Sequence, residues 1–311
     1  MPEAIDQVEA LGAAVHGDPG ALTALIPDWE SAVRIERRGP ALWLTLDRQD
    51  TLNGLAPDLM AALFKGLDQA EDPDVRSVVI TGAGRAFSAG GDLPFEQSLL
   101  GTDRGVKEGW PRWLEINGVF MARLRSLPKP VIAAVQGVAV AGGLEIIANC
   151  DIVVAGENVK IGDAHLNYGF LPGAGEASIL ARVVGPHRLK RLLFTGELLT
   201  ARELESWNFI SKIVPDDRVH AEVEGMTEVM AAKSAPAIAG LKRLIGEGLD
   251  APLDVAIRLE WEHIVRYSLG PDVQDGVAAF VEKRKPEYSG KVPTVIPAGQ
   301  PASFRKPDPQ V

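Results

Sequence analysis

The chain has 311 residues, of which 46% are hydrophobic, so it can form one large or two small domains with a sizeable core. Its net charge of −10 argues against a nucleic-acid partner, and any polyanionic ligand must be held by local donors. The single cysteine, Cys150, excludes an internal disulfide framework and a cysteine zinc cluster. Without an apolar run of membrane-spanning length or a signal peptide, we expect a soluble cytoplasmic protein and no membrane partner.

The first part of the chain predicts a ββαβ arrangement. Residues 1–30 mix Gly and Pro with short apolar helical pieces, and we expect an N-terminal extension there. The alternating residues 33–36 and the apolar run 41–46 flank a Gly-Pro turn, which is typical of a β-hairpin. A helix with one apolar face begins near Pro57, and residues 77–81 form a buried strand.

A glycine-rich loop, residues 82–92, follows that strand directly. It invites comparison with a dinucleotide site, but it lacks the third glycine of G-x-G-x-x-G and leads into no helix pattern, so we disfavour that interpretation. Residues 93–112 predict a mobile flap over a pocket, with Trp110 and Trp113 shaping the pocket. Apolar residues with helical spacing from Trp113 to Leu127 then predict an amphipathic helix.

The stretch from Val131 to Asp151 carries the most information about function. It opens as a β-branched strand and continues, from Gly142 and Gly143 on, as a buried helix. Paired glycines that open a helix leave unsatisfied N–H groups with no side chain in front of them, which suits a developing negative charge. Before Asp151, Glu145 is the one charged side chain of this stretch. The sequence therefore predicts an oxyanion site beside a carboxylate.

Two interpretations of Glu145 remain open. Burial in an apolar site raises the pKa of a carboxyl group towards the range useful for proton transfer, while a helix N-terminus opposes that rise. Glu145 is then a working acid or base. Alternatively, it is a structural carboxylate at a helix start that is bonded to backbone groups.

The rest of the chain changes from alternating strands and helices to helices alone. Residues 151–155 predict a strand, and Thr200 has the character of a helix N-cap. We expect further helices at 176–184 and 186–195 and a last short strand at 210–214. The fold class is α/β. The expected domains are the extension (1–30), an α/β core (31–218), a helical C-terminal region (219–288) and a Pro-rich tail (289–311).

Several separate motifs occur in the order typical of one family. They are Asp47-Arg48 with Asn53-Gly54-Leu55, Gly84 to Leu93, Pro130 to Gly137 with Ala141 to Glu145, Asn149 to Ile152 with Gly169 to Gly175, Leu193 to Glu197, and Ala279 to Pro286. On these motifs the chain resembles the crotonase superfamily, the enoyl-CoA hydratase/isomerase proteins. The resemblance covers about residues 31–290 and implies a spiral of ββα units with a helical trimerisation region. It also implies a homotrimer or a dimer of trimers.

The resemblance further implies an acyl-CoA thioester as substrate and stabilisation of its enolate. The two oxyanion-hole donors of the family correspond to the N–H groups of Gly91 and Gly142. At Gly91 the lack of a Cβ is expected to let the thioester oxygen approach. The residues that correspond to CoA contacts are Ala89, Gly90, Asp92, Phe280 and Lys283, and Pro94 replaces a basic residue that often contacts a phosphate.

The sequence departs from the hydratase pattern at one catalytic position. Glu145 corresponds to the first of the two carboxylates that activate water, but His165 occupies the place of the second. An imidazole also exchanges protons near neutral pH, and Asp163 is close to it in sequence. A hydratase with a Glu/His pair is one interpretation. The others are another reaction of the superfamily (isomerase, thioesterase, decarboxylase or C–C hydrolase) and a histidine that only packs.

The leading prediction is an enoyl-CoA hydratase-like lyase with Gly91, Gly142, Glu145 and His165 as its catalytic groups, no cofactor beyond the CoA of the substrate, and no metal. A serine hydrolase is a second hypothesis, because the sequence around Ser88 weakly resembles a nucleophile elbow. A third hypothesis is a CoA-binding or scaffold protein without catalysis.

Overall fold

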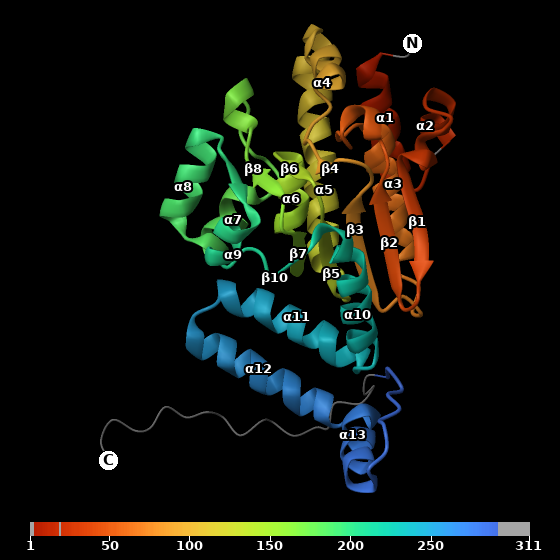
Figure 1. Cartoon of the computed structure of the whole chain (residues 1–311). Helices are drawn as coiled ribbons and strands as arrows, with labels where there is room; N and C mark the ends of the chain where they lie inside the picture. The colour runs from red at the N-terminus through yellow and green to blue at the C-terminus, as the bar shows by residue number, and fades with distance from the viewer. Residues whose placement is uncertain (1–2, 19, 292–311) are drawn as a thin grey trace, which may run out of the picture. The chain divides into compact units, whose positions relative to one another are not determined.

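The structure is a computed structural model that describes residues 3–18 and 20–291. The chain divides into two compact units, Met1–Ala231 and Ala232–Val311 (Figure 1). The expected boundaries after residues 30, 218 and 288 remain predictions, and most of the expected tail, 289–311, lies outside the described residues.

The larger sheet of the first unit has six strands in the order β1-β2-β3-β5-β7-β10. β1 and β2 form the antiparallel hairpin expected from the sequence, and the other neighbours pair in parallel. The strands are β1 (Val33–Arg38), β2 (Ala41–Leu46), β3 (Ser77–Gly82), β5 (Val131–Val135), β7 (Ile152–Gly156) and β10 (Lys212–Val214).

Helices cover both faces of this sheet, and β2 shows why. All six of its residues are buried, but alternate side chains enter different clusters because successive side chains in a strand point to opposite faces. Leu42, Leu44 and Leu46 join the main core with helices α3 (Pro57–Gln69) and α5 (Trp110–Ser126). Ala41 and Trp43 join a smaller cluster with α10 (Val219–Ala231).

A second, smaller sheet positions the candidate site. Its order is β4-β6-β8-β9, with β4 (Ala86–Ser88), β6 (Val138–Val140), β8 (Lys160–Gly162) and β9 (Leu198–Thr200). β4, β6 and β8 are parallel, so their carboxyl ends lie at one edge of the sheet. The chain leaves these three ends towards Gly91, Gly142 and His165 respectively. Residues far apart in sequence are thereby brought to one edge, where open α/β sheets commonly bind ligands.

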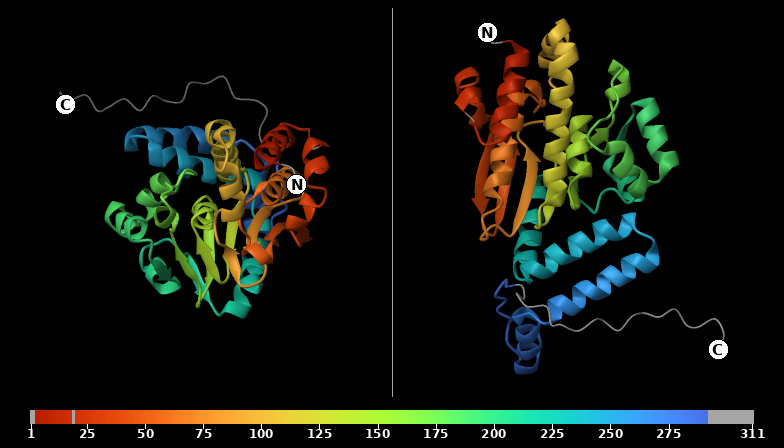
Figure 2. Two further views of the ribbon diagram at one scale, coloured as in Figure 1. Left: turned by 90° about the horizontal axis from the view of Figure 1, so that it is seen from above. Right: turned by 180° about the vertical axis from the view of Figure 1, so that it is seen from behind.

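Further helices of the first unit flank this sheet. In Figures 1 and 2, α7 to α9 lie on the other side of it from α1 to α3. The N-terminal helix α1 belongs to the core, since Ile5, Val8 and Leu11 are buried in the main cluster. The bounds are α1 (Ala4–Val15), α2 (Gly20–Leu25), α6 (Gly142–Ala148), α7 (Glu176–Val184), α8 (Pro186–Thr195) and α9 (Ala201–Ser206).

The prediction of an irregular flap over residues 93–112 is wrong. The structure has helix α4 (Leu93–Leu100), a π-helical turn (Gly105–Gly109) and then the start of α5. The Asp92 side chain caps α4 by accepting a hydrogen bond from the Phe95 N–H at 3.2 Å. Pro94 lies in the first turn, where a missing N–H does no harm. The sequence therefore contained a helix start that we interpreted as a loop.

The second unit is helical, in agreement with the expected C-terminal region. It contains α11 (Ala235–Asp250), α12 (Leu253–Ser268) and α13 (Pro271–Glu282). The Ser234 hydroxyl accepts from the Ala237 N–H at the start of α11 and donates to Asp272 at 2.6 Å, which links α11 to α13. Within residues 3–18 and 20–291, no helix is long and apolar enough to cross a membrane.

Candidate active site

A cavity of about 500 Å³ opens at the shared edge of β4, β6 and β8. Its wall includes residues that follow each of the three strands, together with aromatic side chains from α5 and the segment before α7. Trp110 and Phe170 stack there with ring centroids 5.3 Å apart. The predicted site residues that line it are Ala89, Gly91, Asp92, Gly142, Glu145 and His165. The size and lining suit a ligand that is largely apolar with a few polar anchor points.

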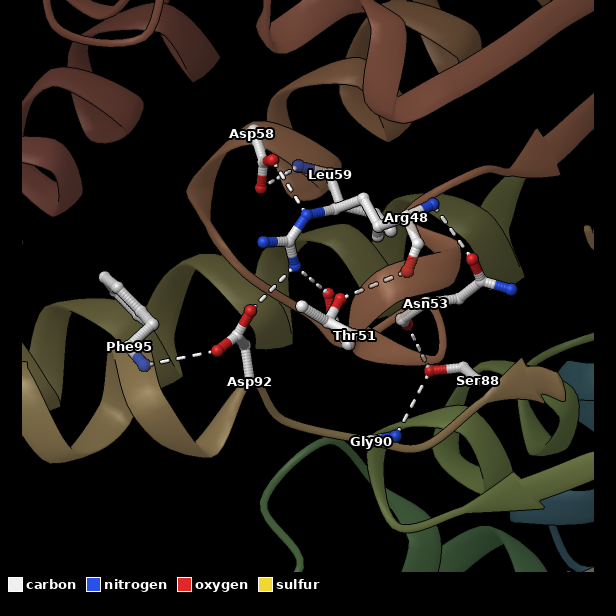
Figure 3. A network of polar contacts seen from close by, with 10 residues as sticks. Arg48, Thr51, Asn53, Asp58, Leu59, Ser88, Gly90, Asp92 and Phe95 are labelled. Atoms are coloured by element: carbon white, nitrogen blue, oxygen red, sulfur yellow. Dashed lines mark hydrogen bonds and ion pairs between the residues drawn. The ribbon is translucent and has the colours of Figure 1, made fainter.

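The loop that carries Gly91 is fixed by a polar network (Figure 3). Arg48 forms ion pairs with Asp58 at 2.8 Å and Asp92 at 2.9 Å. Asn53 is fully buried, and its side-chain amide nitrogen donates to one carbonyl group before β4 and to two within it. The backbone carbonyl of Asn53 accepts from the Ser88 hydroxyl. These bonds explain why the Asp47-Arg48 and Asn53 motifs accompany the glycine-rich loop.

Two backbone donors face this cavity. In the described part of the chain, the N–H groups of Gly91 and Gly142 have no hydrogen-bond acceptor. Their segments are adjacent, since a Cβ on Gly90 would lie 3.2 Å from the nitrogen of Gly142. Ala141 has φ 49°, which is unfavourable for a residue with a side chain and turns the chain sharply before α6. Two unpaired donors beside one cavity can hold an oxyanion.

Neighbouring side chains lie close to both donor glycines. A Cβ on Gly91 would collide with the carboxyl group of Glu96, and one on Gly142 would lie 2.6 Å from the Leu55 side chain. The ends of two neighbouring side chains thus occupy the Cβ positions of these glycines. That the missing Cβ of Gly91 lets the thioester oxygen approach stays a prediction.

Glu145 lies in the first turn of α6 and is 6% exposed. Its Oε1 accepts from the N–H groups of Gly173 at 3.0 Å and Ala174 at 2.8 Å. The backbone bonds of the structural interpretation are present, and they also orient the group. Because both bonds use Oε1, Oε2 is the oxygen that a water molecule in the cavity would contact.

His165 and Asp163 form a pair after β8. Asp163 is fully buried, and its Oδ1 contacts the Nδ1 of His165. This contact places a proton on Nδ1 and leaves Nε2 for other partners. Burial lowers the pKa of His165, but the bond to Asp163 and the charges of Asp163, Glu145 and Glu96 outweigh burial and raise it above its ordinary value. Proximity in sequence left open whether Asp163 contacts His165, and the structure shows that it does.

Two carboxyl groups were missed by sequence analysis. Glu96 lines the cavity, and burial with the charge of Asp92 raises its pKa to about 7, against the opposing effects of His165 and the Trp113 indole. Glu176 is fully buried, and neither of its oxygens has a hydrogen-bond partner among the described residues. Burial, with the charges of Asp163 and Glu145, raises the pKa of Glu176 to about 9. A helix N-cap signal could have revealed Glu96, but nothing in the sequence marked Glu176.

Asp163, His165 and Glu176 are residue types that bind metals, and one ligand atom from each lies within 4.8 Å of the others. However, the Nδ1 of His165 is already engaged by Asp163, whereas the oxygens of Glu176 have no hydrogen-bond partner among the described residues. When Glu176 carries a proton it is neutral, and the repulsion between the negative charges of the cluster is smaller. We therefore interpret the cluster as proton-binding.

We expect Glu176→Gln to flatten the dependence of stability on pH. The pKa of Glu176 is raised in the folded state, so its contribution is fully present below about pH 4.5 and is lost as the pH rises towards about 9. Between pH 6 and 8 the stability of the wild type should fall relative to the variant by about 1 kcal/mol per pH unit. Urea unfolding of both proteins across this range measures the difference, and parallel curves would contradict an elevated pKa.

Other predicted residues have different surroundings. Ser88 is fully buried, donates to the Asn53 carbonyl at 2.8 Å and accepts from the Gly90 N–H, so it is a structural residue of the loop and not an accessible nucleophile. The serine hydrolase hypothesis is therefore not supported. Phe280 and Lys283 belong to the second unit, where Phe280 is 87% exposed and Lys283 has φ 58° at the end of α13.

The structure and the sequence motifs together define a crotonase fold with two unpaired backbone donors at one sheet edge. The chain belongs to the enoyl-CoA hydratase/isomerase family, which it matches over residues 37–291. An enoyl-CoA hydratase of Mycobacterium tuberculosis is 33% identical over 259 residues, covering 83% of this chain and 96% of that protein. A short-chain-enoyl-CoA hydratase of Clostridium acetobutylicum is 33% identical over 257 residues, covering 82% of this chain and 96% of that protein. The solved structure of an enoyl-CoA hydratase from Polaromonas sp. JS666 has a TM-score of 0.78 at 33% identity, covering 82% and 99% of the two chains.

Proposed function

We propose that the protein is an enoyl-CoA hydratase-like lyase that adds water to an α,β-unsaturated acyl-CoA. The observation that carries this proposal is the pair of unpaired N–H groups at Gly91 and Gly142, facing a cavity that Glu145 and His165 also line. The family supports the same substrate class. The reaction needs no cofactor beyond the CoA of the substrate.

The chemistry follows from this arrangement. The thioester oxygen accepts hydrogen bonds from Gly91 and Gly142, which draws electron density away from the β-carbon. Glu145 accepts a proton from water as its oxygen bonds to that carbon, and the electrons move to the thioester as an enolate. Protonated His165 donates to the α-carbon and gives the 3-hydroxyacyl-CoA. Proton return from Glu145 to His165 restores the site.

We assign the remaining contacts by the family resemblance. Backbone groups of Ala89, Gly90 and Asp92 contact the adenine and pantetheine, and Phe280 and Lys283 contact the nucleotide end. A cytoplasmic location is consistent with the single cysteine.

A homotrimer or dimer of trimers is the proposed assembly. On α11, Leu241, Ile245 and Leu249 recur every four residues and are 60%, 64% and 69% exposed. On α12, Leu253 and Ile257 are also more than half exposed. Apolar stripes of this kind are typical of surfaces that another subunit covers. Light scattering measures the assembly directly, and a monomer at micromolar concentration would contradict it.

The second candidate is another crotonase-type reaction on acyl-CoA: isomerisation, thioester hydrolysis, decarboxylation or C–C hydrolysis. The specific observation in its favour is the His165–Asp163 pair, since an imidazole oriented by a buried carboxylate can activate water for hydrolysis.

A panel of unsaturated and saturated acyl-CoA thioesters analysed by mass spectrometry tests both candidates. Hydration adds one water, isomerisation leaves the mass unchanged, and hydrolysis or decarboxylation splits the substrate. We expect hydration of at least one 2-enoyl-CoA. A protein that binds thioesters and converts none of them would instead be the CoA-binding or scaffold protein without catalysis.

A further inference from the structure

Glu96 occupies a position that the hydration chemistry does not require. It lies in the first turn and a half of α4, where its N–H donates to the Asp92 carbonyl at 2.9 Å. Helix α4 begins directly after the Gly91 loop and places the Glu96 carboxyl group against Gly91. A Cβ on Gly91 would collide with that carboxyl group. The residue is 8% exposed and lines the cavity. A carboxyl group therefore lies next to an oxyanion donor.

Ion pairing does not explain this carboxyl group. In the described part of the chain, no lysine or arginine forms a salt bridge with Glu96, whereas the neighbouring Asp92 is paired with Arg48. Among its neighbours, the indole of Trp113 is a donor that favours the charged form and so lowers the pKa of Glu96. Burial of an incompletely paired carboxyl group is unfavourable, and a cavity for a plain hydrocarbon chain would gain nothing from it.

The rest of the wall sets the chemistry of the group that Glu96 would meet. Trp110, Trp113, Leu114 and Phe170 make the wall apolar, so the ligand portion there is mainly hydrocarbon. Glu145 also lines the cavity, and its negative charge disfavours a negatively charged group on the ligand there. A neutral oxygen substituent satisfies both conditions, because a carboxyl group can donate to it or accept from it.

We propose that Glu96 is a specificity-determining residue that selects acyl groups bearing a hydroxyl or keto oxygen within the first five carbons of the chain, counted from the thioester. This inference rests on the proposed acyl-CoA chemistry. The position near the thioester follows from contact with Gly91, since the thioester oxygen must lie within hydrogen-bond distance of the Gly91 N–H. An unsubstituted chain would leave the Glu96 carboxyl group desolvated without a partner, and sites of this type reject such analogues strongly.

The test compares trans-2-hexenoyl-CoA with its 5-hydroxy and 5-oxo counterparts. We expect kcat/KM of the wild type to be at least ~10-fold higher for the oxygenated substrates. Glu96→Leu should lower their kcat/KM about 10- to 100-fold and change that of hexenoyl-CoA by less than about 3-fold. Glu96→Gln, which can still donate and accept, should keep most of the preference. Glu71→Gln, at an exposed carboxyl group, is the matched control.

Two outcomes would overturn the inference. An equal loss on all three substrates in Glu96→Leu would assign the residue to the oxyanion site or to the structure, and no preference in the wild type would remove the premise. Calorimetric binding of hexanoyl-CoA and 5-hydroxyhexanoyl-CoA gives a readout that needs no turnover. If no thioester is hydrated but the binding preference depends on Glu96, hydration is refuted while the specificity assignment stands.

Discussion

Glu145→Gln is expected to lower kcat for hydration about 10²–10⁴-fold and to change KM by less than about threefold. Glutamine has nearly the same shape, and its Oε1 can still accept from the N–H groups of Gly173 and Ala174, so the α6 turn keeps its position. The change removes the ability to take a proton from water. The effect therefore falls on the chemical step and not on binding.

Steady-state kinetics on a hydrated 2-enoyl-CoA measures this expectation. Glu157→Gln is the matched control because Glu157 is exposed in the turn after β7. An unchanged kcat in Glu145→Gln would leave Glu145 with the structural role alone, and the proposed mechanism would then lack its base. A loss confined to KM would argue that the carboxyl group orients the substrate.

His165→Gln is expected to reduce kcat about 10²–10³-fold, since it removes the proposed proton donor to the α-carbon. Asp163→Asn should act through the imidazole. Burial lowers the pKa of His165, and the bond to Asp163 is the largest effect that raises it. Loss of that carboxylate should therefore lower the pKa of His165.

The pH profile separates these roles. If protonated His165 is the acid, activity declines as the pH rises through its pKa, so Asp163→Asn should move the alkaline limb to lower pH. His165→Gln should lack this limb. A melting temperature within a few degrees of the wild type shows that Asp163→Asn is folded. A limb that stays in place in the folded variant would mean that Asp163 only holds the loop after β8.

Much of the fold could be predicted because its elements carry strong local signals. The strand at 41–46, the helices at 176–184 and 186–195 and the cap at Thr200 are all present in the structure. The helix at 93–100 was missed because its cap, Asp92, is also a member of the glycine-rich motif and its first turn contains Pro94. Local composition was therefore compatible with both a loop and a helix start. In the structure, the ion pair with Arg48 holds Asp92, the residue that caps the helix.

The candidate site divides in the same way. The motifs identified Gly91, Gly142, Glu145 and His165, and the structure brings all four to one cavity. The roles of Glu96 and Glu176 depend on approaches between distant segments. The Glu96 carboxyl group approaches Gly91 from the next helix, and Glu176 on α7 lies close to Asp163. Contacts of this kind produce no periodic pattern in the sequence.

The edge formed by β4, β6 and β8 has a consequence for how this family can diversify. The two proposed oxyanion donors follow β4 and β6, whereas the imidazole and its carboxylate follow β8. Each strand end is continued by a separate segment of chain. In the proposed mechanism, substitutions after β8 can redirect the enolate to a new product while the two backbone donors are kept, so a change of reaction needs no change of scaffold.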